Sequence, residues 1–284
     1  MTRPADNGST PTGRPRVGRA HEPWATAITH VEPNRILVRG YPVDEMMGRL
    51  SFAETIYLLL VGELPSPAIG RLMEALLVSS VDHGTTPPST LATRHVASTG
   101  GSMRSCVAAG ILAFGPYHGG DIESCMCFLD ASLTLVRSGA SYDDAAARMV
   151  GEYRQRHEPI PGFGHRVHTH DPRSARLFQM ALELELDGEY MQMMRAVERV
   201  LNAHRDPRIP INVDGAIAAV CSDIGLDRSV GNAMFIISRV PGLVAQAHEE
   251  QQRERRMRQI DATGARYDGP PERRLPERRA DRQL

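Results

Sequence analysis

The sequence predicts an all-α protein with a short N-terminal hairpin, and three observations support that fold class. Apolar residues recur at helical spacing through most of the chain between residues 50 and 256. Glycine and proline, which interrupt helices, gather in a few loops and leave long uninterrupted stretches between them. Alternation of apolar and polar residues, the pattern of strands, is found in residues 26–41 around Pro33-Asn34 and predicts the hairpin.

The first helix after the hairpin is predicted from a repeating apolar face that ends at Gly62. The residues that share this face are Phe52, Ile56, Leu59 and Leu60. A second helix begins at Ser66-Pro67, where proline suits the first turn, and runs toward His83-Gly84.

The rest of the chain predicts further helices. Residues 90–113 are apolar and small, with an interruption at Gly100-Gly101, and Ser141 with Asp144 resembles a capping box. Helices are expected at residues 121–137, from 141 onward, and at 172–186, 189–203, 212–224 and 228–256. The loops at 115–120, 159–172 and 206–211 carry the polar residues that the helices lack.

Composition limits the class of protein. The chain has 284 residues, of which 41% are hydrophobic and 24% charged, so it can bury the core of one large domain or two closely joined ones. The formal charge of -1 provides no overall field for nucleic acid or an anionic membrane. All 33 basic residues are arginine. The lack of lysine excludes Schiff-base aldolases, pyridoxal-phosphate enzymes, P-loop enzymes and protein kinases, which all need a lysine amine.

The ends of the chain and its cysteines bear on the compartment. Residues 1–22 are rich in proline, glycine and arginine, and we expect a disordered N-terminal tail there. No secretory signal is readable, and no apolar run is long enough to span a bilayer. The four cysteines lack the spacing of a zinc site. We therefore expect a reduced, cytoplasmic protein that binds neither nucleic acid nor membranes.

Three short segments place polar side chains between glycines in otherwise apolar surroundings. They are GPYHGG at residues 115–120, PGFGHRVH at residues 161–168 and NVDG at residues 212–215. Glycine lets the backbone approach a ligand closely, and helix N-termini present unpaired N–H groups to anions. Two imidazoles and a carboxylate placed in this way suit proton transfer next to a carbonyl group, with arginine holding carboxylates.

Each of these segments has a simpler interpretation when taken alone. A single histidine on a glycine loop is more often a structural hydrogen-bonding group, and Asp214 alone would be a helix cap. Arg173 alone reads as a surface residue of a helix that begins at proline. The order of the three segments along the chain is what favours a site.

That order resembles the citrate synthase family. The resemblance runs from about residue 25 to about residue 271, and also includes LSF at 50–52, LLL-x-G-x-LP at 58–65 and DHG at 82–84. It implies a two-domain helical fold with a large domain at residues 23–119 and 230–284 and a small one at residues 120–229. It also implies a cleft between these domains that closes on the substrate and a homodimer with shared active sites.

The resemblance implies roles for the residues of the three segments. His118 matches the histidine that hydrogen-bonds the thioester oxygen of acetyl-CoA and stabilises its enol. Asp214 matches the base that removes the methyl proton, and His165 matches the histidine that polarises the ketone of the oxo-acid.

Binding roles follow from the same resemblance. Substrate-binding positions are matched by His83, Arg173, Arg239 and Arg258, the last of which would reach across a dimer. The CoA-binding positions are Pro161, Gly162, Phe163, Gly164 and Arg166. CoA is expected as a thioester substrate, with no tightly bound cofactor and no metal.

The implied reaction makes or breaks the carbon–carbon bond between acetyl-CoA, or another short acyl-CoA, and oxaloacetate or a related oxo-acid. As a citrate synthase the protein would be an acyltransferase of the tricarboxylic acid cycle. The chain departs from the synthases after Asp214, where Gly-Ala-Ile-Ala replaces a common Ser-Gly pair. This departure and the short chain look like the citryl-CoA lyases of the same superfamily, so both reactions stay open.

Two further hypotheses belong to other classes. His165-x-x-His168-x-His170-Asp171 crowds groups that bind metals, but it lacks the H-E-x-x-H and H-x-H-x-D-H patterns of metallohydrolases. The arginine-rich C-terminal tail and the divergent segment before it would suit a non-catalytic helical protein that binds CoA or a partner. Metal analysis and acetyl-CoA proton exchange separate these hypotheses from the main one.

Overall fold

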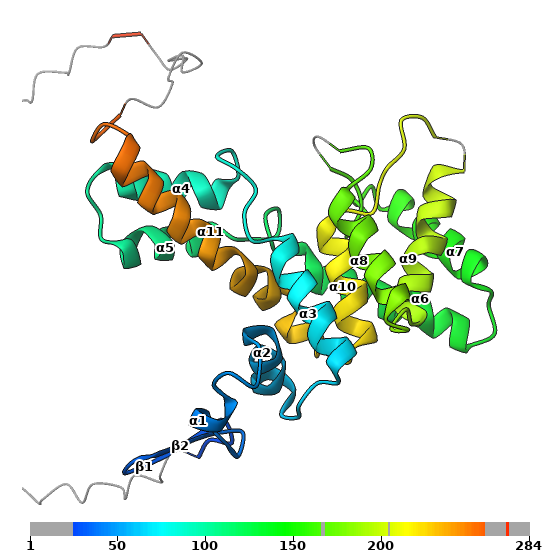
Figure 1. Cartoon of the computed structure of the whole chain (residues 1–284). Coiled ribbons are helices and arrows are strands. Elements are labelled where there is room, and N and C mark those ends of the chain that lie inside the picture. The colour runs from blue at the N-terminus through cyan, green and yellow to red at the C-terminus, as the bar shows by residue number, and fades with distance from the viewer. Residues whose placement is uncertain (1–24, 166–167, 204, 259–270, 273–284) are drawn as a thin grey trace, which may run out of the picture. The chain divides into compact units, whose positions relative to one another are not determined.

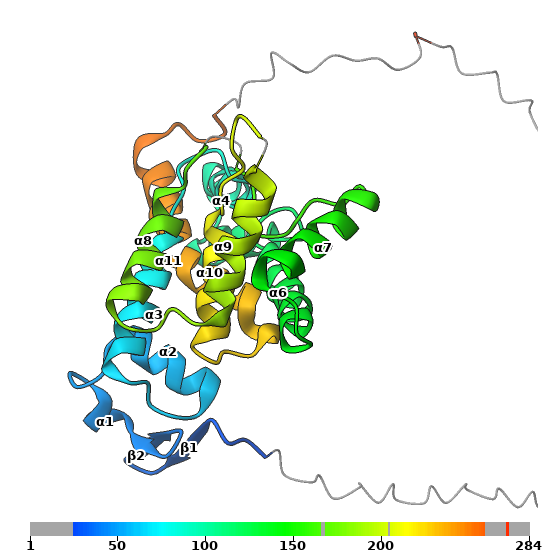
Figure 2. The same ribbon diagram turned by 90° about the vertical axis from the view of Figure 1, so that its right-hand side faces the viewer.

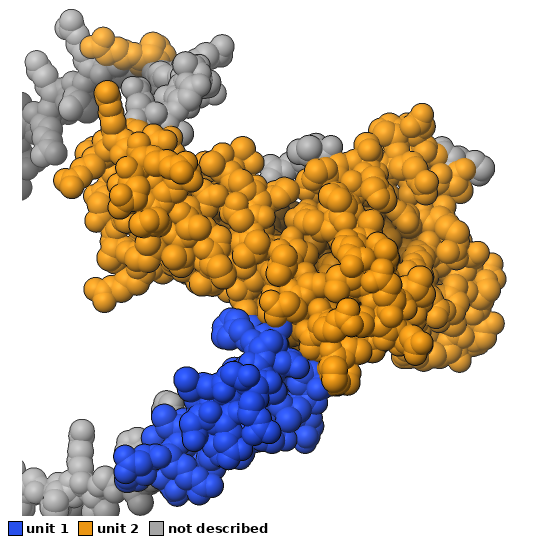
Figure 3. Space-filling model, in the orientation of Figure 1, with its two compact units in different colours: residues 1–65 blue, residues 66–284 orange. Residues whose placement is uncertain are grey.

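The computed structural model describes residues 25–165, 168–203, 205–258 and 271–272. The predicted tail at 1–22, the CoA-binding residue Arg166 and most of the C-terminal tail lie outside these residues. The chain separates into two compact units, residues 1–65 and residues 66–284, which Figure 3 colours separately. The predicted division into 23–119 with 230–284 and 120–229 stays a prediction.

The first unit contains the predicted hairpin. Strand β1 (Thr29–Glu32) pairs antiparallel with β2 (Arg35–Val38), which also pairs with the short β3 (Tyr41–Pro42). Pro33-Asn34 forms the turn, and Asn34 has a φ of 62°, a left-handed conformation that asparagine tolerates. The hairpin predicted from the alternating pattern at residues 26–41 is therefore confirmed.

The same unit continues with α1 (Val43–Met46) and α2 (Phe52–Val61). A capping box begins α2 at Ser51, and Gly62 ends it with a φ of 95°. The predicted apolar face is only partly correct, because Phe52 keeps 76% of its surface exposed. The buried residues are Ala53, Ile56, Tyr57 and Leu58. Phe52 is the first residue of the helix, where side chains have fewer helical neighbours to pack against.

The second unit is helical, and its helices match the predicted order. They are α3 (Pro67–Ser79), α4 (Pro88–Ser98), α5 (Met103–Leu112), α6 (Asp121–Arg137), α7 (Tyr142–Gln155), α8 (Pro172–Glu183), α9 (Glu189–Asn202), α10 (Val213–Asp223) and α11 (Gly231–Arg253), with a 3-10 turn at Arg228–Val230. The breaks coincide with the glycines and prolines of the sequence. Ser66 and Ser141 cap α3 and α7 as expected.

Helix α10 lies among α6, α8 and α9, as Figures 1 and 2 show. Its residues from Gly215 to Cys221 are apolar, and all of them are buried. The long helix α11 packs against α3, α4, α5 and α6. The loops before α6, α8 and α10 therefore converge at the N-terminal end of one central helix, and this positions the site.

No helix in the described part of the chain is long and apolar enough to cross a membrane. The four cysteines are free, and Cys127 is the exposed one.

Candidate active site

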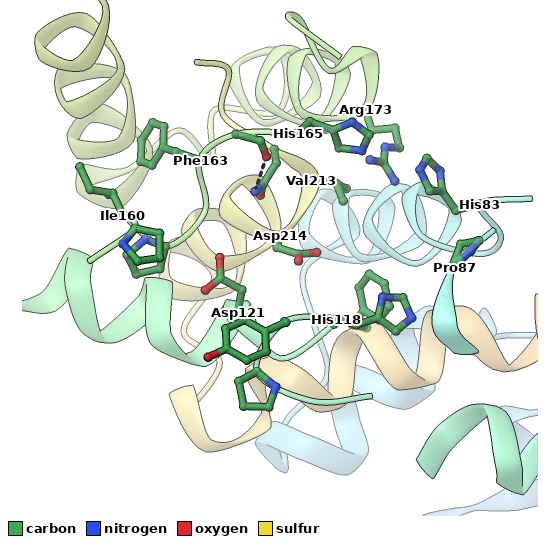
Figure 4. Close-up of a pocket in the computed structure, with 18 of the residues that line it drawn as sticks. His83, Pro87, His118, Asp121, Ile160, Phe163, His165, Arg173, Val213 and Asp214 are labelled. Carbon is green, nitrogen blue, oxygen red and sulfur yellow. Dashed lines mark hydrogen bonds between the residues drawn. The ribbon is translucent and has the colours of Figure 1, made fainter. Parts of the chain in front are cut away.

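A cavity of about 550 Å³ in the second unit gathers the polar residues of all three predicted segments (Figure 4). The walls come from loops and helix starts at the N-terminal end of α10. The lining residues are His83, Pro87, Pro116, Tyr117, His118, Gly119, Asp121, Pro159, Ile160, Pro161, Phe163, Gly164, His165, Arg173, Asn212, Val213, Asp214, Phe235 and Arg239. Residues far apart in the sequence thus face one space.

His118 is held by a tight turn and by the start of α4. Gly115 and His118 exchange two backbone hydrogen bonds of 3.0 and 2.9 Å. The His118 Nε2 accepts the backbone N–H of Ser89 at 3.3 Å and lies 2.8 Å from the Ser89 hydroxyl. In the tautomer in which Nε2 accepts this N–H, the neutral ring carries its proton on Nδ1.

The second and third segments are tied together by backbone pairing. The Gly164 N–H donates to the Pro210 carbonyl at 2.9 Å, and the Asn212 N–H donates to the Gly162 carbonyl at 3.1 Å. The Asn212 side chain caps α10 through the Gly215 N–H and also donates to the Gly164 carbonyl. This pairing brings the loop that carries His165 against the helix start that carries Asp214.

Asp214 is the second residue of α10, and the cap is Asn212. Its Oδ1 is buried and has no hydrogen-bond partner among the described residues. Burial, followed by the nearby charge of Asp121, raises the pKa of Asp214 to about 6, although Arg173 and Arg239 oppose the shift. A buried carboxyl that can hold or release a proton near neutral pH suits acid–base chemistry.

His165 lies beside two other imidazoles. Its Nδ1 accepts the backbone N–H of His168 at 3.1 Å, its ring stacks on the His168 ring at 4.4 Å, and His83 meets it edge-on at 5.6 Å. Partial desolvation and the positive charge of Arg173 lower the pKa of His83, which favours its neutral form. His165 and His83 therefore offer hydrogen bonds from one side of the cavity.

Two arginines supply positive charge near these imidazoles. Arg173 makes a bidentate pair with Asp171, at 3.0 and 2.8 Å, at the start of α8. Arg239 is 2% exposed, donates from Nε to the Ser80 carbonyl at 2.7 Å, and has no partner for Nη1 among the described residues. A buried guanidinium N–H without a partner is costly, so a carboxylate oxygen at this position would stabilise the site.

Two of the described candidates, Gly162 and Arg258, do not line the cavity. Arg258 is engaged elsewhere. It pairs with the buried Glu250 of its own chain through hydrogen bonds of 2.5 and 3.1 Å, and Arg94 binds the same carboxylate at 2.7 Å. Its expected role across a dimer stays a prediction. No group of three His, Cys, Asp or Glu side chains within the described ranges is arranged to hold a metal ion.

The sequence analysis did not assign a role to Asp121, Ser89 or Asn212. Asp121 follows the GPYHGG segment directly, and this position is the sequence signal that could have identified it as a site residue. Ser89 lies 29 residues before His118, and no pattern in the sequence links the two. Asn212 belongs to the NVDG segment and precedes an apolar helix, which is the usual signature of a cap.

Similar proteins agree with this geometry. Residues 65–260 match the family described as citrate synthase, C-terminal domain. Among solved structures, a citryl-CoA lyase from Hydrogenobacter thermophilus is 43% identical, with a TM-score of 0.81 and coverage of 89% of this chain and 97% of that one. A citrate synthase from Pyrobaculum aerophilum has a TM-score of 0.64 and 26% identity over 81% of this chain and 56% of that one.

Curated relatives point to the same family. The citrate synthase of Deinococcus radiodurans is 33% identical over 76% of this chain and 57% of its own length. Citrate synthase 2 of Bacillus subtilis is 32% identical over 75% of this chain and 56% of its own length. The chain thus spans somewhat more than half the length of these two relatives.

The structure is a helical fold with a cavity that combines a buried carboxyl, imidazoles and arginines, and this combination suits acid–base chemistry. The matched residues make up most of the second unit and include every described residue of the cavity wall. The chain belongs to the citrate synthase family.

Proposed function

We propose that this protein cleaves citryl-CoA into acetyl-CoA and oxaloacetate. The observation that carries the proposal is the similarity to the Hydrogenobacter thermophilus citryl-CoA lyase, which is 43% identical to this chain with a TM-score of 0.81. The curated citrate synthases of Deinococcus radiodurans and Bacillus subtilis are 33% and 32% identical.

The cavity supplies groups for each part of this reaction. His83, His165, Arg173 and Arg239 would bind the carboxylates and the oxygen of the oxo-acid half. When the carbon–carbon bond breaks, His165 would take the proton of the citryl hydroxyl, whose oxygen becomes the ketone of the oxo-acid, and the acetyl-CoA half would leave as an enol or enolate. His118 would hydrogen-bond the enol oxygen, and Asp214 would give a proton to the terminal carbon, which becomes the methyl group.

Citrate synthesis is the second candidate function, and the family match and the curated relatives favour it. The same residues would then work in the opposite direction, with Asp214 removing the methyl proton as a base. Hydrolysis of the citryl thioester would separate this function from the lyase.

CoA takes part as a thioester substrate in both cases, and we propose no tightly bound cofactor. The residues around the PGFG turn would hold it, with Pro161, Gly162, Phe163 and Gly164 in contact through backbone and ring, and Arg166 near its phosphates. We further propose that the protein acts in the cytoplasm as a homodimer. If it is a citrate synthase, its product citrate places it in the tricarboxylic acid cycle.

Two incubations test the proposal. Citryl-CoA alone should yield acetyl-CoA and oxaloacetate without release of free CoA thiol. Acetyl-CoA with oxaloacetate should give no steady thiol release if the lyase is correct, whereas citrate and free CoA would identify a synthase. Failure of both reactions, with CoA still bound, would favour a non-catalytic protein.

The role of Asp214 is tested by proton exchange. With oxaloacetate or a related acid present, the protein should exchange the methyl protons of acetyl-CoA with deuterium from solvent. Asp214→Asn should abolish this exchange, because no other carboxyl in the three segments can take the proton. Near-normal exchange in the variant would remove Asp214 as the proton-transferring group.

A further inference from the structure

Asp121 is a second carboxyl in the cavity to which the proposed chemistry gives no role. It is the first residue of α6 and lines the same cavity as Asp214, and Figure 4 draws both carboxyls. Its Oδ2 accepts the backbone N–H of Gly162 at 2.7 Å. The side chain therefore binds the loop that would hold CoA, and its charge acts on the carboxyl that would move the proton.

The Gly162 loop rests directly on the first turn of α10. A Cβ placed on Gly215 would lie 2.3 Å from the Gly162 carbonyl oxygen, and one on Gly162 would lie 2.7 Å from the Gly215 Cα. The Asn212 N–H donates to the same Gly162 carbonyl. Asp121 thus accepts a hydrogen bond from Gly162, a buried residue that also contacts the first turn of α10, where Asp214 lies. Loss of the Asp121 carboxylate would leave the buried N–H of Gly162 unpaired.

The charges around Asp214 are of both signs. Helix α6 contributes Asp121 and Cys125, and the start of α8 contributes Asp171 and Arg173. Helix α11 contributes Arg239, and the loops contribute His118 and His165. Helix α9 contributes the uncharged Met194. After burial, Asp121 contributes most to the raised pKa of Asp214, and Arg173 and Arg239 act against it. Burial also raises the pKa of Cys125 well above its usual value, so this thiol is neutral.

We propose that Asp121 is a positioning residue of this site, which holds the Gly162 loop against α10 and whose negative charge favours the protonated form of the neighbouring Asp214. This inference rests on the proposed function only for its catalytic consequence. The protonated fraction of Asp214 is the form that can protonate the enol carbon formed by carbon–carbon cleavage.

Carbon-13 NMR tests the charge effect without any turnover. The carboxyl carbons of aspartate are labelled, and the Asp214 signal is identified by its absence from Asp214→Asn. The titration midpoint of this signal should fall by about 1 pH unit in Asp121→Asn, which removes the charge but keeps an oxygen to accept from Gly162. Asp130→Asn, which removes a charge from the same helix away from the cavity, should leave the midpoint unchanged. An unchanged midpoint in Asp121→Asn would overturn the proposal.

Kinetics separate the charge of Asp121 from its hydrogen bond. With citryl-CoA as substrate, turnover by Asp121→Asn should be about tenfold slower than that of the wild type at pH 7 and within about twofold of it at pH 5. The reason is that a titration midpoint lowered by one pH unit reduces the protonated fraction of Asp214 by about these factors. Asp121→Ala also loses the acceptor and should raise KM as well. Equal KM values for the two variants would refute the positioning role. If no variant turns over citryl-CoA, the proposed function fails, and the NMR midpoints still decide the role of Asp121.

Discussion

Asp214 and Asp223 are buried carboxyls at the two ends of α10, and burial raises the pKa of each to about 6. Asp223 accepts the N–H groups of Tyr190 and Met191, both at 3.1 Å, and so satisfies the start of α9. Asp214 makes no such bond through Oδ1 within the described residues. The raised pKa of Asp223 is thus explained by its structural role at the start of α9, whereas the raised pKa of Asp214 indicates a functional role.

Asp214→Asn should stabilise the protein at neutral pH. The folded pKa of about 6 lies above the usual value of 3.8, so the folded state holds a proton that the unfolded state has lost between these values. Stability therefore decreases as pH rises from about 4 to 6, by roughly 3 kcal/mol for the two-unit difference. Asparagine has no charge to bury and avoids this loss. Urea unfolding should show the gain at pH 7.5 and little difference at pH 4.

Asp223→Asn is the matched control for that experiment. It also removes a buried charge, but asparagine leaves one oxygen where Asp223 used two to accept from α9. Its gain in stability at pH 7.5 should be smaller than that of Asp214→Asn. A wild type at least as stable as Asp214→Asn at pH 7.5 would show that Asp214 carries no burial penalty.

His118→Ala should reduce kcat by a hundredfold or more, or about 2.7–4 kcal/mol of barrier, as loss of one oxyanion donor does. The measurement is steady-state turnover of citryl-CoA. His95→Ala removes an exposed imidazole from α4 outside the cavity and should keep full activity. A loss below tenfold in His118→Ala would mean that another group stabilises the enol.

At the scale of elements, the contact between the Gly162 loop and α10 requires glycine at both Gly162 and Gly215, because neither position has room for a Cβ. Gly215→Ala would place a Cβ 2.3 Å from a backbone oxygen and 2.7 Å from the Met194 methyl, so the loop must move. A shift of this size should lower kcat/KM about 100-fold with helical circular dichroism preserved.

Gly151→Ala is the control substitution for Gly215→Ala. Gly151 lies in α7 with nothing within 4 Å of a new Cβ, so alanine should stabilise the helix by about 0.5–1 kcal/mol without affecting turnover. Normal kcat/KM in Gly215→Ala would show that the loop does not need its close contact with α10.

Helix boundaries were predictable because their signals are local. Ser66-Pro67 begins α3, Ser141 caps α7, and α6 spans the predicted residues from Asp121 to Arg137. The buried face of α2 was not predictable in the same way. Phe52 fits the helical spacing, yet its exposure depends on what the rest of the unit places next to it.

At the scale of the whole molecule, Glu250 joins the C-terminal residues to the helices. It is 1% exposed and accepts from Arg94 and Arg258, while the Met257 N–H donates to the Ser98 carbonyl. Arg258 is thus engaged within its own chain. A role in a partner's site would require it to leave the Glu250 carboxylate.

Mixed dimers test that role. If Arg258 acts across the proposed dimer, mixing Arg258→Ala with Asp214→Asn should restore activity, because one site of the hybrid then has both intact residues. Mixing His118→Ala with Asp214→Asn should restore none, because both residues line the cavity of one chain. Turnover after subunit exchange is the measurement. Full activity of Arg258→Ala alone, or a mixture as inactive as its parts, would exclude a shared site.

The sequence by itself determined the hairpin, the order of the helices, the starts of several of them, and the three segments that supply His118, His165 and Asp214, because caps, turns and apolar spacing act over a few residues. Some helix ends differ from the prediction, since the helix expected at 228–256 is a 3-10 turn followed by α11 at Gly231–Arg253. Only the tertiary structure decided which groups meet. Asp121 binds Gly162 across 41 positions and Arg94 binds Glu250 across 156. Long-range contacts of this kind, and the burial that raises the pKa of Asp214, arise when helices pack, and helical spacing alone does not contain them.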